Sequence, residues 1–205
     1  MAWHGMTCAS SPRPPAIVVV AYDPAWIAMF ERVRALVRPV LHDVALAIEH
    51  VGSTSVPGMW AKPIVDVDVI VVDEAAVVLA ITRLAAIGYT HRDNLGLTGR
   101  EAFEAPRGGP SLPLHHLYVC PQGSVALRNH LALRDHLRAH PASARAYGAL
   151  KRHLARAHPH DIDAYVAGKT DFVLAILRAA GFGPDDLEAI ERVNRAPPRA
   201  PSSGI

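Results

Sequence analysis

The sequence is poor in cysteine, in net charge and in long apolar runs, and each shortage excludes a class of protein. Cys8 and Cys120 are the only cysteines, and neither belongs to a closely spaced pair, which excludes a disulfide framework and a cysteine-rich zinc site. A formal net charge of +2 argues against a long polyanion, so no nucleic-acid partner is expected. No apolar run approaches the roughly 20 residues that span a bilayer, so no membrane partner is expected either.

The two ends of the chain differ in composition from the part between them. Residues 1–15 lack the apolar segment of a signal peptide and are expected to form a disordered lead-in, with the cytoplasm as the default location. Residues 194–205 contain three prolines and two adjacent serines, which predicts a disordered tail.

Residues 16–122 show the mixture of strand and helix patterns that is typical of an α/β core. Apolar β-type runs predict strands at residues 44–51, 64–72 and 114–120, with a further short strand around Phe103 and a short apolar run at 17–21. Apolar residues at helical spacing predict helices at residues 24–38 and 73–87.

Residues 123–193 change to helical periodicity. Helices are predicted at residues 124–140, 141–158 and 161–180, followed by a fourth after Pro184. The fold class expected is therefore α+β, a small mixed sheet with helices followed by a C-terminal helical region packed on that core. These amphipathic helices can pack on the sheet or on a partner chain, and the sequence leaves the oligomeric state open.

The most informative segment places two carboxylates in an apolar strand. Asp66 and Asp68 are one residue apart, so their side chains point to the same face of the predicted strand. Buried among valines, two like charges repel each other and are costly to desolvate unless a cation lies between them. The pair therefore predicts a divalent metal ion, with an edge strand facing water as the alternative.

A turn of small residues precedes this strand. Gly52 and Ser53 are followed by 12 residues and then by Asp66-Val67-Asp68. The arrangement resembles the signature of the DNA polymerase β-like nucleotidyltransferase superfamily, in which the turn binds phosphates and the acids bind Mg²⁺.

A more specific resemblance covers residues 21–180. The segment EHVGSTSVPGMWAKPIVDVDV, with YDPAW before it and HHLYV, HLALRDHLRAHP, YGALK and YVAGKTDFV after it, is similar to the GrpB family. The resemblance implies a nucleotidyltransferase-like fold, with Mg²⁺ as cofactor and ATP or another NTP as co-substrate.

The resemblance also implies roles for individual residues. Asp66 and Asp68 match the metal-binding pair. The phosphate-contacting candidates are those of the turn, the segment before the strand and the C-terminal helices: Gly52, Ser53, Thr54, Ser55, Lys62, Arg134, Lys151 and Lys169. For each cation of the C-terminal helices, a solvated helix face or a surface ion pair is the favoured alternative.

The superfamily usually adds a third carboxylate on a later strand, and this chain departs from that pattern. The matching strand carries His116 and Tyr118 on one face and no acid, so His116 is a candidate metal ligand or base, and Glu104 is the nearest acidic alternative. The leading hypothesis is Mg²⁺-dependent transfer of a nucleotidyl group from an NTP to a small-molecule acceptor. The alternatives are a non-catalytic nucleotide-binding or regulatory module and a ligase-like activation of a carboxylic acid by ATP.

Overall fold

A computed structural model describes residues 14–106 and 112–195. Its strands form one sheet in the order β1-β2-β5-β4-β3: β1 (Ala45–Val51), β2 (Val65–Val71), β3 (Thr90–His91), β4 (Glu101–Glu104) and β5 (His115–Pro121). The sheet is mixed, because β2 and β5 run parallel while the other neighbours are antiparallel.

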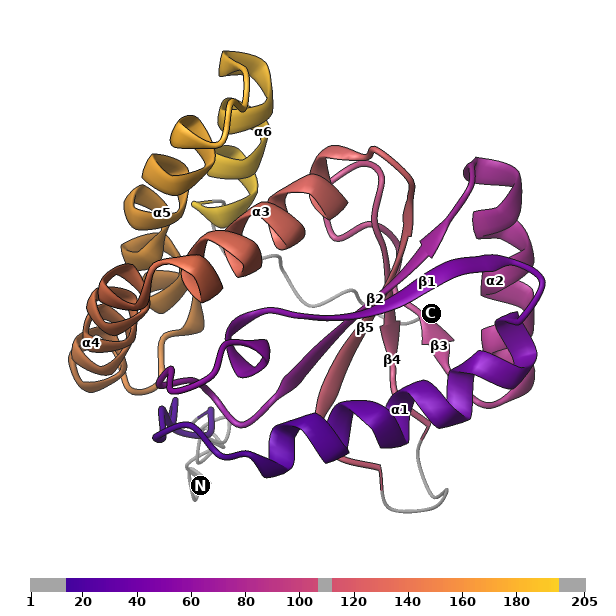
Figure 1. Cartoon of the computed structure of the whole chain (residues 1–205), viewed down its shortest axis with the longest axis horizontal. Helices are drawn as coiled ribbons and strands as arrows, with labels where there is room; N and C mark the ends of the chain where they lie inside the picture. The colour runs from indigo at the N-terminus through magenta and orange to yellow at the C-terminus, as the bar shows by residue number, and fades with distance from the viewer. Residues whose placement is uncertain (1–13, 107–111, 196–205) are drawn as a thin grey trace, which may run out of the picture.

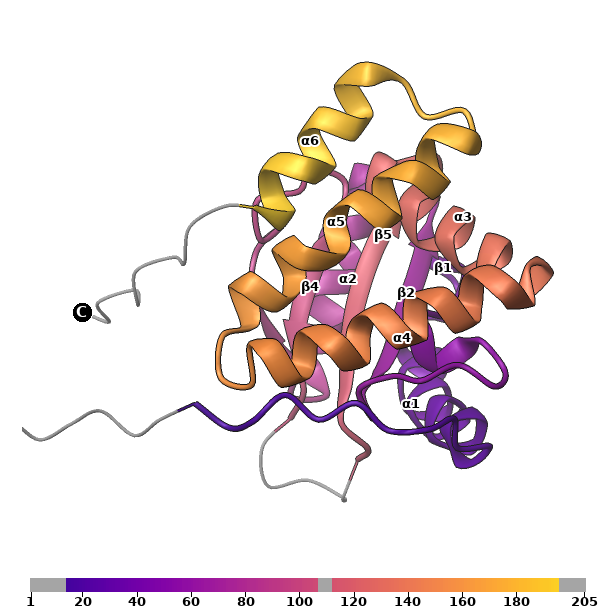
Figure 2. The same ribbon diagram turned by 90° about the vertical axis from the view of Figure 1, so that its left-hand side faces the viewer.

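The helices of the described residues lie on both faces of this sheet (Figure 1). They are α1 (Ala25–Leu41), the 3₁₀ turn η1 (Ser53–Ser55), α2 (Glu74–Ala86), α3 (Val125–Ala139), α4 (Pro141–Ala157), α5 (Ile162–Ala179) and α6 (Pro184–Asn194). Helices α1 and α2 cover one face, and α3 to α6 lie on the other side. Figure 2 shows α4 and α5 in front of the strands. The expected α+β class is confirmed.

The alternation of β2 decides which residues enter the core. Four valines of β2, all 0% exposed, pack with α1 and α2 in the main hydrophobic cluster: Val65, Val67, Val69 and Val71. Because strand side chains alternate, Asp66 and Asp68 point to the opposite face, toward the C-terminal helices. The apolar residues thus anchor the strand while its two acids face the layer formed by α3 to α6.

Most elements lie within a few residues of their predicted bounds, and the differences have local causes. Helix α1 continues past Arg38 and through Pro39, because Leu41 extends its buried stripe by another turn. The two-residue strand β3 was not predicted, since two residues carry no readable periodicity. The apolar run at 17–21 forms only a bridge between Val20 and Ala61.

The predicted lead-in and tail lie almost entirely outside the described residues, at 1–13 and 196–205. Asn194, predicted as the start of the tail, is the last residue of α6. Among the described residues, none of the helices combines the length and the apolar character that crossing a membrane requires.

Candidate functional site

The turn after β1 lies directly against the side chain of Asp66. Gly52 has a φ of +66°, and a Cβ atom built on it would lie 2.0 Å from Oδ2 of Asp66. Any side chain there would displace this carboxylate, and the left-handed backbone also favours glycine. The structure therefore brings together Gly52-Ser53 and the first aspartate, which 12 residues separate in the sequence.

Two hydroxyl groups of the turn make hydrogen bonds within the protein. The Thr54 hydroxyl accepts a hydrogen bond from Nε2 of His50 at 3.0 Å and donates to the Ile64 carbonyl at 3.4 Å. The Ser55 hydroxyl donates to the Gly52 carbonyl at 2.7 Å. Both hydroxyls thus hold the turn in shape, and Thr54 and Ser55 stay predicted phosphate contacts. The Ser53 side chain has no hydrogen-bond partner among the described residues and stays a phosphate-binding candidate.

Each aspartate of β2 is paired with a histidine. Nδ1 of His116, on β5, donates to Oδ1 of Asp66 at 2.9 Å. Nδ1 of His130, on α3, lies 2.8 and 3.1 Å from the two oxygens of Asp68, whose side chain is 0% exposed. The charges that appeared to require a metal thus have imidazole partners in the protein itself. An edge strand facing water, the other interpretation of the pair, is excluded because β2 lies between β1 and β5.

These pairings shift the ionisation of the groups involved. Burial raises the pKa of Asp66, but the hydrogen bond and charge of His116, with the charges of His130 and Lys62, outweigh it and leave the pKa below its ordinary value. Burial lowers the pKa of His130, and the opposing charge and hydrogen bond of Asp68 raise it above the ordinary value. The surroundings therefore favour the carboxylate form of Asp66 and the protonated form of His130.

His130 is a site residue that sequence reasoning missed. It lies 62 residues beyond Asp68, and its helix periodicity does not show that it meets the sheet. The available signal was its position as the first residue of the motif HLALRDHLRAHP.

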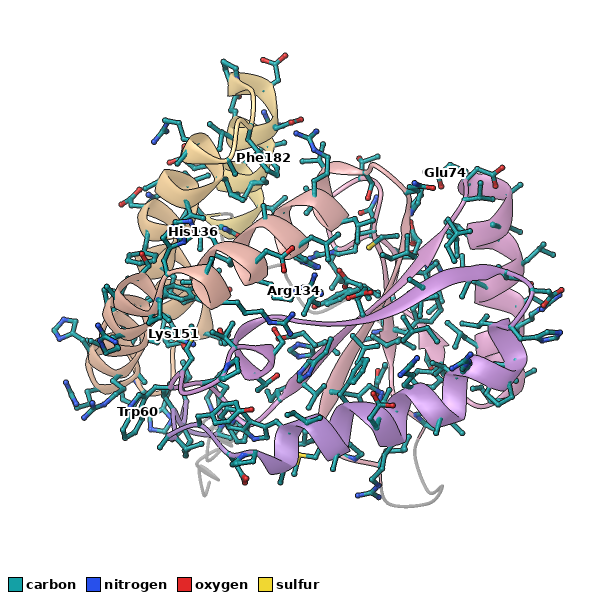
Figure 3. The ribbon with its side chains drawn as sticks, viewed as in Figure 1. Trp60, Glu74, Arg134, His136, Lys151 and Phe182 are labelled. Carbon is teal, nitrogen blue, oxygen red and sulfur yellow. The ribbon has the colours of Figure 1, made fainter. Side chains whose placement is uncertain are left out.

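Three lysines from separate segments gather around Asp66. Lys62 precedes β2, Lys151 lies on α4 and Lys169 lies on α5, and the carboxylate of Asp66 interacts electrostatically with all three. Lys151 is 2% exposed, and its Nζ atom has no hydrogen-bond partner among the described residues. Figure 3 labels Lys151 among the side chains of α4. The solvated helix face, favoured from sequence for each of these cations, is therefore wrong for Lys151.

Two of these lysines share a local arrangement. Nζ of Lys151 lies 5.0 Å from the ring centroid of Tyr147, and Nζ of Lys169 lies 4.7 Å from that of Tyr165, so each lysine covers a tyrosine four residues earlier on its helix. Burial, with the charge of Lys62, lowers the pKa of Lys169 to about 8. Burial, with the charges of Lys169 and Lys62, lowers that of Lys151 well below its ordinary value. The cluster is thus a crowded set of amines that an anion would stabilise.

Arg134 is hydrogen-bonded to groups that none of the lysine candidates contacts. Its Nη1 atom donates to Glu49 at 2.7 Å and to the His50 carbonyl at 3.3 Å, and its Nε atom donates to Asp135 at 2.7 Å. Figure 3 shows Arg134 between α3 and β1. None of these contacts is with Asp66, Asp68 or the lysines, so the arginine joins α3 to β1 rather than extending the lysine cluster.

We expect Arg134→Met to lower the free energy of unfolding by about 1–2 kcal/mol, because ionic hydrogen bonds on a largely buried guanidinium are lost. Nucleotide affinity is expected to stay unchanged in the folded variant. Urea unfolding and calorimetric titration with Mg²⁺ and ATP measure the two quantities. A loss of affinity of about tenfold or more would instead place Arg134 among the nucleotide contacts.

On β5, a histidine and a tyrosine lie beside the two aspartates, where the superfamily usually has its third carboxylate. Asp66 is the register partner of His116, and Asp68 is that of Tyr118. Glu104 lies on β4, and Nε of Arg92 is 3.6 Å from its carboxylate. The guanidinium of Arg100 lies 4.8 Å from the Tyr118 ring centroid, so this end of the site carries a cation.

The two aspartates are the residues that would hold a metal ion. The described residues contain no group of three His, Cys, Asp or Glu side chains placed to hold a metal by themselves. Mg²⁺ at nucleotide sites commonly takes one or two carboxylates and completes its shell with phosphate and water oxygens. Asp66 and Asp68 fit that shared mode of binding, and they do not make a metal centre of protein ligands alone.

Comparison with known proteins agrees with the resemblance seen in the sequence. The family "GrpB protein" matches residues 16–179. The chain is 36% identical over 157 residues to UPF0157 protein YqkA of Bacillus subtilis, covering 77% of this chain and 45% of YqkA, so it spans less than half of that relative. It is 35% identical over 170 residues to UPF0157 protein BH1888 of Halalkalibacterium halodurans, covering 82% of this chain and 85% of that protein.

A solved structure shares the fold. The crystal structure of conserved protein GrpB from Enterococcus faecalis superposes with a TM-score of 0.68 at 37% identity, covering 85% of this chain and 98% of that chain. With the family match over 16–179, this places the described residues within one known architecture. The chain belongs to the GrpB family.

Proposed function

We propose that this protein binds a nucleoside triphosphate with Mg²⁺ and transfers its nucleotidyl group to a small-molecule acceptor. The observation that carries the proposal is the convergence of three lysines and a closed glycine turn on one carboxylate, Asp66. The buried amino group of Lys151 lies over the Tyr147 ring but has no hydrogen-bond partner among the described residues, which is costly for a charged group unless a ligand supplies that partner. The negative charge of a polyphosphate tail would neutralise the positive charge of this lysine cluster.

The proposed roles follow from position. Gly52 and Ser53 would bind the phosphates at the turn, where the absence of a Cβ on Gly52 allows the turn to lie directly beside Asp66. Lys62, Lys151 and Lys169 neutralise the phosphate charge. Asp66 and Asp68, with phosphate oxygens, would hold Mg²⁺, which when bound screens the charge on the α-phosphate and on the leaving group.

In the proposed reaction, an acceptor hydroxyl oxygen forms a bond to the α-phosphorus as the bond between that phosphorus and the α–β bridging oxygen breaks. Pyrophosphate leaves with the bonding electrons, and the hydroxyl proton passes to solvent or to a nearby base. Nε2 of His116 is a candidate acceptor for this proton, since Nδ1 is engaged by Asp66.

Calorimetric titration of ATP with Mg²⁺ tests the proposal. We expect saturable binding to the wild type and about tenfold weaker binding to Asp66→Asn, since one negative ligand is lost. Asp185→Asn, an exposed acid at the start of α6, is the matched control and is expected to bind like the wild type. Absence of nucleotide binding by the wild type would contradict the proposal.

A second candidate is a nucleotide-binding module without catalysis. It is favoured by His116 standing in β5 where the superfamily usually has an acid, because one negative charge fewer weakens Mg²⁺ binding. Pyrophosphate release, measured with Mg²⁺, ATP and a pool of metabolites, separates the two. Release that depends on Asp66 supports the enzyme, whereas tight binding without release supports the module.

A further inference from the structure

A hollow of about 770 Å³ lies where the chain leaves β1, between the start of α1 and the junction of α3 with α4. Its lining includes Phe30, His50, Val56, Leu137, Arg138 and Arg145. That volume is within the usual range for a small-molecule site. The lining comes from three separate stretches of the chain, 22–31, 50–58 and 137–145, so the tertiary fold defines its shape.

One wall of the hollow is flat and fixed in place. The rings of Phe30 and His50 are stacked with centroids 4.9 Å apart and planes 7° apart. Burial lowers the pKa of His50 to about 4, and its Nε2 atom is held by Thr54 at 3.0 Å. Val56 and Leu137 are buried beside this wall. A planar apolar group would find a preformed surface here.

The other feature of the hollow is an excess of positive charge. The Nε atom of Arg138 donates a hydrogen bond to the Ser55 carbonyl at 3.0 Å. Its two η nitrogens have no hydrogen-bond partner among the described residues and can donate to a ligand. Arg145, on α4, is exposed at the rim. The one acid of the lining, Glu31, is paired with Arg34 at 3.1 Å. Two guanidinium groups therefore face the hollow, and guanidinium suits the planar oxygens of a carboxylate or phosphate.

We propose that this hollow binds a small molecule that joins a planar apolar group to a carboxylate or phosphate. The hollow adjoins the turn through Ser55, but its aromatic wall lies away from the aspartates, because His50 pairs with Val67 and lies on the α1 side of the sheet, opposite Asp66. The proposal does not depend on nucleotidyl transfer. It adds a second ligand class to the protein.

Titration of ¹⁵N-labelled full-length protein with phenyl phosphate tests this site, with benzyl alcohol as the uncharged probe. We expect saturable shifts of the amide signals of the non-proline residues of 55–58 and 137–145, and binding of phenyl phosphate about tenfold or more tighter than that of benzyl alcohol. Arg145→Gln, at an exposed position, and Arg138→Gln are each expected to weaken phenyl phosphate binding about tenfold. Arg152→Gln, seven residues beyond Arg145 on α4 and outside the lining, is the control and is expected to change nothing.

Three results would overturn the proposal: no saturable shifts in these segments, equal affinity for both probes, or equal loss in the Arg152→Gln control. Binding of phenyl phosphate at the lysine cluster would shift signals near Lys151 instead, and the arginine variants would leave it unchanged. Retention of the site in Asp66→Asn is expected, so failure of the nucleotide proposal and failure of this one give different results.

Discussion

Replacing Gly52 by alanine is expected to weaken Mg²⁺-dependent ATP binding roughly a hundredfold, the equivalent of about 3 kcal/mol. The added Cβ would lie 2.0 Å from Oδ2 and 2.7 Å from Cγ of Asp66, both far inside van der Waals contact. Either the turn or the carboxylate must move, and both belong to the proposed phosphate and metal site. Calorimetric titration gives the affinity, and urea unfolding gives the stability of the same variant.

Gly58→Ala is the matched control for this substitution. Gly58 also has a positive φ, +75°, but no atom lies within 4 Å of the Cβ that alanine would add. Gly58→Ala is expected to lose about 1–2 kcal/mol of unfolding free energy through its positive φ, and Gly52→Ala is expected to lose more, because the contact with Asp66 adds to the backbone cost. Only Gly52→Ala is expected to lose nucleotide affinity as well. Equal affinity in the two variants would show that the contact between the turn and Asp66 has no role in binding.

Local pattern was sufficient to predict most of the fold. The valines of β2 alternate with its acids, and the structure buries each valine and turns each acid to the other face. The stripe from Trp26 to Val37 packs as a helix face should. These features are readable because strand and helix periods act within a few residues. The strand order and the pairing of β2 with β5 arise from contacts between residues about 50 positions apart, which the periodicity of a short segment cannot predict.

The candidate site was predictable in part, for the same reason. Gly52 and Asp66 belong to one motif and lie side by side in the structure, while their roles toward phosphate and metal stay predictions. The histidine on Asp68 comes from α3, and a helix read by itself does not reveal which of its faces meets the sheet. The same limit made Lys151 look like a solvated side chain. Its position four residues after Tyr147, repeated by Lys169 after Tyr165, was a signal present in the sequence.

Lys151→Met is expected to act in opposite directions on folding and on binding. The substitution removes a buried amino group that has no hydrogen-bond partner among the described residues. It should raise the free energy of unfolding at neutral pH by about 1–3 kcal/mol, since methionine fills a similar volume without the desolvation cost of a charged group. Removal of its charge should weaken Mg²⁺·ATP binding about ten- to hundredfold. Urea unfolding and calorimetry of the same samples measure both effects.

The dependence on pH gives this prediction a second test. The pKa of Lys151 is lowered in the folded protein, so the unfolded chain binds the extra proton at every pH between the folded pKa and the ordinary value of 10.5. The stability of the wild type should therefore rise with pH across that range, and the advantage of Lys151→Met should shrink toward pH 10.5. Arg152→Met, an exposed neighbour whose guanidinium covers the Trp60 ring, should show neither effect. A variant at Lys151 that is less stable than the wild type and binds nucleotide normally would make this lysine a structural residue and remove the main support for the phosphate site.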